Sequence, residues 1–584
     1  MSYPPVSVLA VDESVTGQGV GRVIGTEDAT PLEFWVGIGP DQFLQLDDVV
    51  ATSRPLPGRE PVDMYGIVTQ VRARHEGVRF DTDVFLVADG VLPAEISQAA
   101  LVATTRFEPE VFVPPLPGSV VHRAAHSQRD KALGWERWQH KLPAGLSRDD
   151  DPIYVNLEFL DGTRGAHVNI SGISGVATKT TYASFLLYSL FTSGVLGAEA
   201  ANTKALVFNV KGEDLLFLDR ANRFLEAEDV DRYHLLHLPA DRFPSVGFFA
   251  PPRRGDRNGT PDVAGRGEGV TSFYWTIAEF CHDELLPFLF ADAEDDRQQY
   301  TLVVSNVTAR LREAQDVGDG AVSIDGSVLR TFRQLADFIA ERVHDDSDGW
   351  AGRAIGGGTV NAFIRRLYGA VKPLEHLIRA DLARPERHRI RLEEQVTVVD
   401  LHNLNDRAKR FVVGVTLRRT FEEKERGGSS RPLLFVVLDE LNKYAPRDGS
   451  SPIKEILLDV AERGRSLGVI LIGAQQTASE VERRIVANSA IRVVGRLDPA
   501  EATRPEYGFL TGVTRQRATI LRPGSMFLAQ PELPVPLLVT FPFPAWATRI
   551  SEAVDAMTTP HHDRVEDGYH PAQNDDPFAG LADP

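Results

Sequence analysis

The sequence has very little cysteine and no excess of positive charge. Cys281 is the only cysteine among 584 residues, which excludes a disulfide framework and a cysteine-based zinc site. We therefore expect a protein of the reducing cytoplasm. The formal net charge is −19, which argues against a protein that coats nucleic acid nonspecifically over its whole surface. It leaves open a ring in which only the central pore is basic.

The sequence also lacks a convincing export or membrane segment. Met1–Pro5 has neither the basic start nor the apolar core of a signal peptide. Thr180–Ala198 carries no charge, but its content of Ser, Thr, Tyr and Gly favours a helix buried inside an α/β domain over a membrane helix. Hydrophobic residues make up 42% of the chain and charged residues 25%, as in an ordinary soluble protein. We expect no membrane association.

The length allows about two to four domains. Short apolar runs separated by turn residues before residue 150 predict a small β-barrel. We predict a barrel domain over 1–150, an α/β domain over 151–545 with a largely helical insertion at about 220–395, and an acidic C-terminal tail over 546–584. The strands expected in the barrel are 21–24, 33–38, 42–46, 66–72 and 83–87.

The most informative segment is an apolar run that ends in two acids. Leu433–Leu438 predicts a strand buried on both faces, and Asp439 and Glu440 follow it directly. Two carboxylates in this position are costly unless they hold a metal. In phosphoryl-transfer enzymes one such acid binds Mg²⁺ and the next activates the attacking water, and we predict these roles for Asp439 and Glu440. The structural alternative is a strand end that caps a neighbouring helix.

A second segment has the context of a phosphate-binding loop. The predicted strand 167–170 leads through a glycine-containing turn to Lys179 and Thr180, and then to a predicted helix. Backbone amides and the helix N-terminus in such a turn bind phosphates. Lys179 would contact the terminal phosphates and Thr180 would bind Mg²⁺. The predicted nucleotide-binding residues are Gly172, Ser174, Gly175, Val176, Ala177, Thr178, Lys179, Thr180 and Thr181.

The glycine spacing of this loop departs from the usual pattern. The standard motif has one glycine six residues before the lysine and another immediately before it, and here Ile173 and Thr178 occupy those positions. Thr178 replaces a glycine whose conformation or close approach to phosphate can matter. The loop alone is compatible with a plain strand-to-helix turn, so its interpretation depends on the downstream pair of acids.

These motifs, in this order, resemble the HerA-type ATPases of the HerA–FtsK superfamily over roughly residues 1–545. The resemblance implies a HAS-like β-barrel followed by a RecA-like P-loop NTPase core with a mostly parallel sheet, and ATP and Mg²⁺ as cofactors. The segments that carry it are Tyr65–Val68, Pro115–Val121, Val207–Glu213, Thr397–Leu404, Leu438–Pro446, Ala461–Gly468, Ile472–Thr477, Asn488–Leu497 and Leu521–Phe527.

The resemblance also implies roles for single residues. Gln475, at the end of an apolar predicted strand, would sense the γ-phosphate or orient water, although it could also simply cap the strand. Arg465 or Arg463 would be an arginine finger that reaches the neighbouring subunit's nucleotide. Both lie near a helix end, where cations also offset the helix dipole, and we favour Arg465 without a physical reason that separates them. Asn209 replaces the family's aspartate and leaves Glu213 as the acid of its segment, a change expected to slow hydrolysis.

A translocating ring needs basic groups in its channel that grip phosphates without reading bases. The candidates are Arg483 and Arg484 after the predicted sensor strand, and the pair Arg365 and Arg366 in the insertion. Arginine on a helix is more often solvated surface. The resemblance implies a homohexamer on double-stranded DNA that works with a NurA-like nuclease or a defence effector protein, since this chain shows no nuclease motif.

The sequence therefore predicts a cytoplasmic, ATP- and Mg²⁺-dependent hexameric DNA translocase or helicase of HerA type, acting in DNA end processing or anti-phage defence. Two other interpretations stay open. One is a nucleotide-gated scaffold ring that organises a defence effector with little motor activity, which the changes at Thr178 and Asn209 favour. The other is a secretion or conjugation ATPase with the same core, against which the predicted barrel and the lack of a convincing membrane segment weigh.

Overall fold

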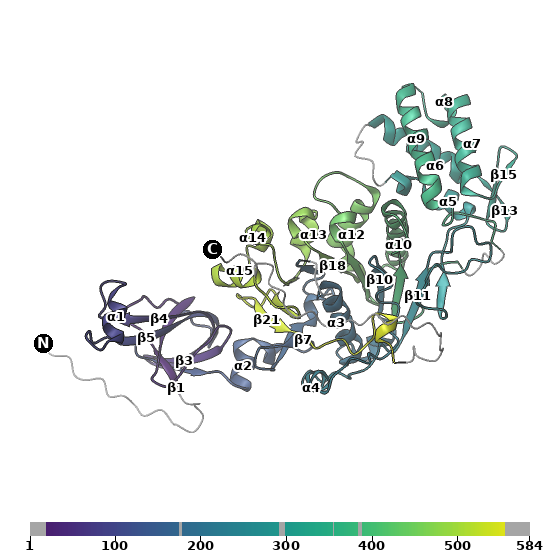
Figure 1. Cartoon of the computed structure of the whole chain (residues 1–584). Helices are drawn as coiled ribbons and strands as arrows, with labels where there is room; N and C mark the ends of the chain where they lie inside the picture. Colours follow the sequence, from purple (N-terminus) through teal and green to yellow (C-terminus); the bar gives the residue numbers. More distant parts are fainter. Residues whose placement is uncertain (1–18, 174–177, 291–297, 354, 383–387, 555–584) are drawn as a thin grey trace, which may run out of the picture.

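Figure 1 shows a computed structural model with a β-barrel at one end, a large α/β sheet in the middle and a helical module at the other end. The structure describes residues 19–173, 178–290, 298–353, 355–382 and 388–554. The predicted fold class is confirmed, because a closed six-stranded barrel precedes a mixed α/β core whose sheet is mostly parallel.

The barrel closes in the order β1-β2-β5-β4-β3-β6, with every neighbouring pair antiparallel. Alternate side chains point inward along its strands, and Val20, Val36, Val68 and Val102 belong to its small apolar core. The strands are β1 (Gly19–Val23), β2 (Glu33–Ile38), β3 (Val49–Leu56), β4 (Arg59–Glu76), β5 (Glu95–Glu108) and β6 (Val120–Arg123).

Two of the predicted barrel strands are wrong. Residues 42–46 form no strand, because Asp48 accepts a hydrogen bond from the backbone of Gln45 at 3.0 Å and turns the chain. Residues 83–87 lie in helix α1 (Asp83–Ala88) at the tip of the long β4–β5 hairpin. The Asp83 carboxylate accepts hydrogen bonds from the backbone of residues 79 and 80, at 3.2 and 3.1 Å, and so fixes this helical turn.

Twelve strands form the large sheet, in the order β12-β11-β16-β10-β17-β18-β9-β19-β20-β21-β7-β8. Neighbours from β12 to β19 are parallel, and the remaining pairs are antiparallel. The strands are β7 (Lys141–Leu146), β8 (Pro152–Asn156), β9 (Val168–Ser171), β10 (Lys204–Asn209), β11 (Val246–Ala250), β12 (Val270–Ser272), β16 (Val396–Asp400), β17 (Leu434–Asp439), β18 (Val469–Gln475), β19 (Ile491–Val494), β20 (Ser525–Ala529) and β21 (Leu537–Thr540). Because β7 belongs to this sheet, the predicted boundary at residue 150 falls inside the β7–β8 hairpin.

Helices cover both faces of the large sheet. Alternate residues of β17 belong to different cores: Val436 and Leu438 pack with α10 (Asp406–Gly427) and α12 (Pro452–Leu467) on one face. Phe435 and Val437 pack with α3 (Thr178–Thr192) on the other face. A strand covered on both sides is apolar at every position, which explains the continuous run in the sequence.

The apolar segment at 180–198 forms most of α3, as predicted for a buried helix. Its side chains Tyr182, Phe185 and Leu186 are buried against the sheet. In the part of the chain that the structure describes, no helix combines the length and the apolar character needed to cross a membrane.

The insertion at about 220–395 contains strands as well as the predicted helices. β11 and β12 extend the edge of the large sheet, and β13 (Gln315–Gly318), β14 (Ala321–Ile324) and β15 (Ser327–Leu329) form a small antiparallel sheet. One of the helices begins at Phe332, because Thr331 and Gln334 form a capping box that fixes its start. The helices of this region are α4 (Ala227–Leu235), α5 (Ile277–His282), α6 (Gln298–Arg312), α7 (Phe332–Asp345), α8 (Ser347–Trp350) and α9 (Gly357–Leu374).

Candidate functional site

The candidate site lies at the carboxyl ends of neighbouring parallel strands. β18 lies between β9 and β17, and the register aligns Gln475 with Ser171 on one side and Ala474 with Asp439 on the other. Parallel strands end at the same edge of a sheet, which is where α/β proteins bind ligands. The sheet therefore brings the turn after β9 and the acids after β17 to one edge.

Thr180 and Asp439 contact each other directly at this edge. The Thr180 hydroxyl donates to Oδ2 of Asp439 at 2.9 Å. Asp439 is only 3% exposed, and its Oδ1 accepts a hydrogen bond from the backbone of Glu440 at 2.8 Å. A carboxylate beside a threonine hydroxyl supplies the oxygen ligands that Mg²⁺ prefers, and Mg²⁺ commonly takes only one or two protein ligands beside substrate phosphates. The pair fits a Mg²⁺ site of this kind.

Lys179 lies in the first turn of α3 and is 4% exposed. Its ammonium group donates to the carbonyl of Gly172 at 2.7 Å, across the turn that follows β9. Burial lowers the pKa of Lys179 and the nearby Lys211 lowers it further, while Asp439 and Glu440 oppose this shift. Thr180 and Thr181 follow it in the same turn, and Thr178 begins the helix. The predicted loop residues Ser174, Gly175, Val176 and Ala177 lie outside the described residues.

Glu440 has a left-handed backbone, with φ 55° and ψ 42°, immediately after β17. This conformation is uncommon outside glycine and is often found at functional sites. Its carboxylate lies 2.8 Å from the Lys443 ammonium and 3.9 Å from that of Lys211, and the side chain is 21% exposed. Helix α11 (Leu441–Tyr444) follows, and a side chain at Gly473 of β18 would come within 2.5 Å of Leu441. The glycine thus lets the turn that carries Glu440 pack closely on the sheet.

Lys211 was not among the residues predicted for the site. It follows β10, the other neighbour of β17, and its Nζ lies 2.9 Å from Oδ2 of Asp439. This is the oxygen that also accepts the Thr180 hydroxyl. The sequence held a signal, because Lys211 comes two residues after the apolar strand β10, much as Asp439 ends the apolar strand β17. Only the sheet order shows that the two strands are adjacent.

Gln475 is fully buried at the end of β18. Its Nε2 donates to Oδ1 of Asn169 and to the hydroxyl of Ser171, both at 2.9 Å. The side chain therefore ties β18 to β9, the strand that leads to the predicted phosphate-binding loop. Its Oε1 has no hydrogen-bond partner among the described residues. The sensor role stays a prediction.

A second polar cluster lies at the ends of β10 and β16. Asn209 donates to Oδ1 of Asp400 at 2.9 Å, and Nδ1 of His402 lies 2.7 Å from the other oxygen of that buried carboxylate. The hydrogen bond to Asp400 raises the pKa of His402, and burial raises the pKa of Asp400. Glu213 instead accepts hydrogen bonds from the backbone of residues 264 and 265. In this structure the Glu213 carboxylate therefore fixes the loop that contains residues 264 and 265.

The two arginine-finger candidates do not lie at the site of their own chain. Arg465 is near the end of α12 and donates to the carbonyls of Gly162 at 3.0 Å and Thr163 at 2.6 Å. β18 begins two residues after α12 ends, so Arg465 lies near the amino ends of the strands, opposite the edge that carries Asp439. Arg463 is exposed and pairs with Glu425. A role in a neighbouring subunit stays a prediction for both.

The predicted DNA-contacting arginines lie in two separate places. Arg483 and Arg484 begin α13 (Arg483–Asn488) in the core and are exposed, and Arg484 pairs with an acid of α12. Arg365 and Arg366 lie on α9 in the helical module, where the Arg366 guanidinium stacks 4.5 Å from the Tyr300 ring. The structure does not bring the two pairs together.

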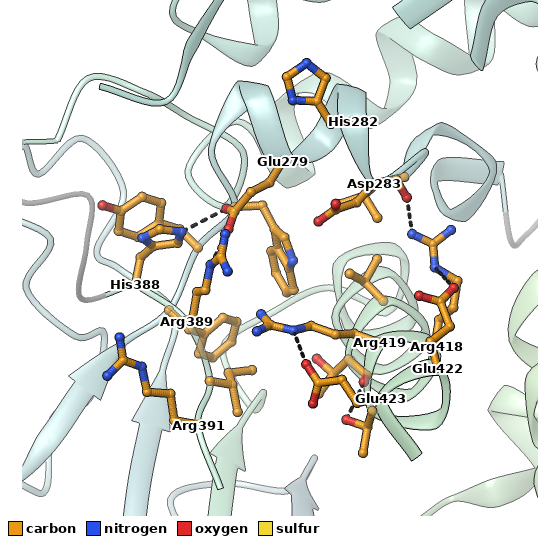
Figure 2. Close-up of a pocket in the computed structure, with 18 of the residues that line it drawn as sticks. Glu279, His282, Asp283, His388, Arg389, Arg391, Arg418, Arg419, Glu422 and Glu423 are labelled. Carbon is orange, nitrogen blue, oxygen red and sulfur yellow. Dashed lines mark hydrogen bonds and ion pairs between the residues drawn. The ribbon is translucent and has the colours of Figure 1, made fainter. Parts of the chain in front are cut away.

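A cavity of about 820 Å³ lies between α5, α10 and the segment before β16 (Figure 2). Glu279 binds both His388 and Arg389 there, and Arg419 pairs with Glu423. Its lining contains five arginines and five acids, so its formal charges balance. None of the residues described above for the candidate site lines this cavity. Among the described residues, no group of three or more His, Cys, Asp or Glu side chains could hold a metal ion.

No family model and no curated protein matches the chain. Similar solved structures include VirB4 of Thermoanaerobacter pseudethanolicus, with 14% identity, coverage of 69% of this chain and 96% of that chain, and a TM-score of 0.42. The plasmid coupling protein TrwB in complex with ADP and Mg²⁺ is 11% identical, and the match covers 69% of this chain and 90% of that chain with a TM-score of 0.42. The genome packaging NTPase B204 of Sulfolobus turreted icosahedral virus 2, in complex with ATP-gammaS, is 11% identical. That match covers 25% of this chain and 68% of that chain, with a TM-score of 0.19.

Proposed function

We propose that this chain is an ATP- and Mg²⁺-dependent translocase or helicase of HerA type that acts on double-stranded DNA. The observation that carries the proposal is the contact between Thr180 and Asp439, which lie 259 residues apart in the sequence, beside the buried Lys179. A lysine and a hydroxyl at the start of a helix that follows a strand, together with a carboxylate at the end of a nearby parallel strand, are the parts that hold a Mg²⁺-nucleotide in P-loop NTPases.

Each of these side chains has a separate task in the proposed reaction. Lys179 binds the terminal phosphates, and Thr180 and Asp439 hold Mg²⁺. The metal, when bound, neutralises the charge that develops on the transferred phosphate. Glu440, which is more exposed than Asp439 and lies next to it, positions a water molecule and accepts its proton.

The remaining assignments extend the proposal to the assembly. Gln475 senses the γ-phosphate through the strand pair that it joins, and Arg465 or Arg463 reaches the nucleotide of the next subunit in a homohexamer. The barrel over about 1–150 acts as a HAS-like domain and residues 151–545 as the motor. The protein works in the cytoplasm with a NurA-like nuclease or a defence effector, in DNA end processing or anti-phage defence.

The direct test is the rate of ATP hydrolysis by the purified protein with and without linear double-stranded DNA. We expect Mg²⁺-dependent turnover that DNA stimulates, and loss of turnover in Lys179→Ala, because the phosphates lose their buried cation. Lys372→Ala, on α9 of the helical module, is the matched control and keeps the wild-type rate. A Lys179→Ala protein that hydrolyses ATP as fast as the wild type would contradict the proposal.

The alternative function is a nucleotide-gated scaffold ring with little motor activity. Asn209 favours it, because this amide stands where the family has an aspartate and already binds Asp400. The scaffold predicts weak binding of ATP or DNA and no DNA-stimulated turnover, both alone and with the partner protein. The same hydrolysis assay, with equilibrium binding of a fluorescent ATP analogue, therefore separates the two functions.

A further inference from the structure

Lys211 contacts the oxygen that the proposed metal would need. Its ammonium lies 2.9 Å from Oδ2 of Asp439, and the Thr180 hydroxyl lies 2.9 Å from the same atom. Mg²⁺ binds carboxylate oxygens at about 2.1 Å, so a metal on Oδ2 would lie at most about 5 Å from this ammonium. Two cations so close together in a largely buried site repel each other strongly.

The structure also shows why a cation lies there. The Asp439 side chain is 5% exposed, and an ionised carboxylate that is buried without a partner is costly. Lys211 gives this carboxylate a cationic partner while no metal is bound. The Lys211 side chain is 41% exposed and lies in the turn after β10, and its ammonium is already 3.9 Å from the Glu440 carboxylate. It can therefore leave Asp439 without moving a strand.

We propose that Lys211 is the counter-ion of Asp439 in the nucleotide-free protein and that the Mg²⁺-nucleotide displaces its ammonium toward Glu440. This inference rests on the proposed nucleotide site and adds a positioning residue to it. Lys211 stabilises the free protein and opposes metal binding. The stability of the free protein and the contribution of Mg²⁺ to nucleotide affinity are thus linked through one side chain.

The test compares Lys211→Met with two controls. Methionine keeps an unbranched side chain and removes the charge, Lys211→Arg restores the charge, and Lys443→Met removes a lysine that pairs with Glu440 and not with Asp439. Two quantities are measured for each protein. One is the melting temperature without nucleotide, and the other is the ratio of the dissociation constants of a fluorescent ATP analogue in EDTA and in Mg²⁺.

We expect Lys211→Met to lower the melting temperature by a few degrees and to raise this ratio on the order of tenfold. The ratio rises because binding of the metal no longer breaks an ion pair. Lys211→Arg and Lys443→Met keep both quantities near wild type. If Lys211→Met does not fold, Lys211→Gln replaces it and the same ratio decides.

Two results would overturn this inference and leave the proposed function standing. The first is a wild-type protein that binds nucleotide with a ratio that Lys211→Met leaves unchanged. The second is an equal loss of affinity with and without Mg²⁺, which would place Lys211 on the phosphates. A wild-type protein that binds no nucleotide in either buffer would instead overturn the proposed function, and this inference with it.

Discussion

Asp439 and Glu440 are neighbours in sequence but have different surroundings. Asp439 ends β17 and is buried beside Thr180 and Lys211, whereas the left-handed backbone of Glu440 turns its side chain to a more exposed place beside Lys443. Two carboxylates in different environments can take different roles, one fixed as a metal ligand and one free to exchange a proton with water.

Replacing Glu440 by glutamine should separate binding from chemistry. Glu440→Gln keeps the size of the side chain and removes the proton acceptor, so we expect hydrolysis to fall at least about a hundredfold while nucleotide affinity stays near wild type. Single-turnover hydrolysis and equilibrium binding measure the two effects. The control Glu455→Gln, an exposed acid in the first turn of α12, should change neither. Rapid hydrolysis by Glu440→Gln would remove Glu440 from the mechanism.

Replacing Gln475 should lower the unfolding free energy of the protein. Gln475→Ala removes two hydrogen bonds and leaves the buried oxygens of Asn169 and Ser171 with fewer donors. We expect a loss of about 1–3 kcal/mol of unfolding free energy, seen as a lower melting temperature. Gln476→Ala changes the exposed neighbour and should stay within about 0.5 kcal/mol of wild type. Equal melting temperatures for the two variants would contradict this role of Gln475.

At the scale of elements, His167 joins β9 to β18. It is 1% exposed, and its Nδ1 accepts a hydrogen bond from the backbone of Leu471 at 2.9 Å. Burial lowers the pKa of His167 from its ordinary value of 6.5 to about 4. The imidazole is therefore neutral in the folded protein over a pH range in which it is protonated in the unfolded chain.

This difference predicts that stability falls on mild acidification. Between about pH 6.5 and pH 4 the unfolded chain binds a proton at His167 that the folded protein does not, so the unfolding free energy decreases as the pH falls, by up to about 3 kcal/mol. Above pH 6.5 this contribution is complete. The melting temperature at pH 7.5 and at pH 5 measures it, and His167→Asn, which suits the local φ of 68°, should show a smaller drop between the two.

His376 also has a pKa lowered to about 4, by burial and two nearby arginines. It is present in both the wild type and His167→Asn, so it does not contribute to the difference between their pH-dependent drops in melting temperature. A drop of equal size in wild type and His167→Asn would contradict the assignment.

The sequence predicted best the elements whose side chains are buried on both faces. The strand predicted at 433–438 is β17 (Leu434–Asp439), one residue away at each end. The helix predicted over 180–198 is α3 (Thr178–Thr192), which begins two residues earlier and ends six residues earlier than predicted. The segments 42–46 and 83–87 failed because aspartates hydrogen-bond to the nearby backbone and override a short apolar pattern. The contact of Lys211 with Asp439 could not be predicted, because it depends on which strands are neighbours.

At the scale of the whole molecule, a short series of contacts links the candidate site to the barrel. The backbone of Ile173, in the turn after β9, donates to the carbonyl of Arg496 at 2.7 Å, and Leu497 donates to Ala518 at the end of α15 (Gly512–Ala518) at 2.9 Å. From α15, Arg517 reaches the barrel. A shift of the turn after β9 would therefore act on an element that contacts the barrel.

The last contact in this series is a bidentate ion pair between Arg517 and Asp47, with N–O distances of 2.9 and 2.6 Å. Both side chains are about one-fifth exposed, so the pair should contribute roughly 1 kcal/mol to docking of the barrel. Arg517→Asp should expose the connection between barrel and core to trypsin, and cleavage within 124–140 should become faster. Basal ATP hydrolysis should not change, because Arg517 does not touch the residues of the proposed nucleotide site.

Arg517 also stacks 5.2 Å from the Phe527 ring, so a single variant loses packing as well as charge. The double variant Asp47→Arg with Arg517→Asp restores an ion pair of opposite polarity and leaves the lost stacking unrepaired. We expect the cleavage rate of the double variant to lie between that of the wild type and those of the two single variants, Arg517→Asp and Asp47→Arg. This comparison isolates the contribution of the charge pair. If all of these proteins are cleaved at the wild-type rate, the ion pair does not hold the barrel against the core. The series of contacts from the turn after β9 would then have no effect on the barrel beyond α15.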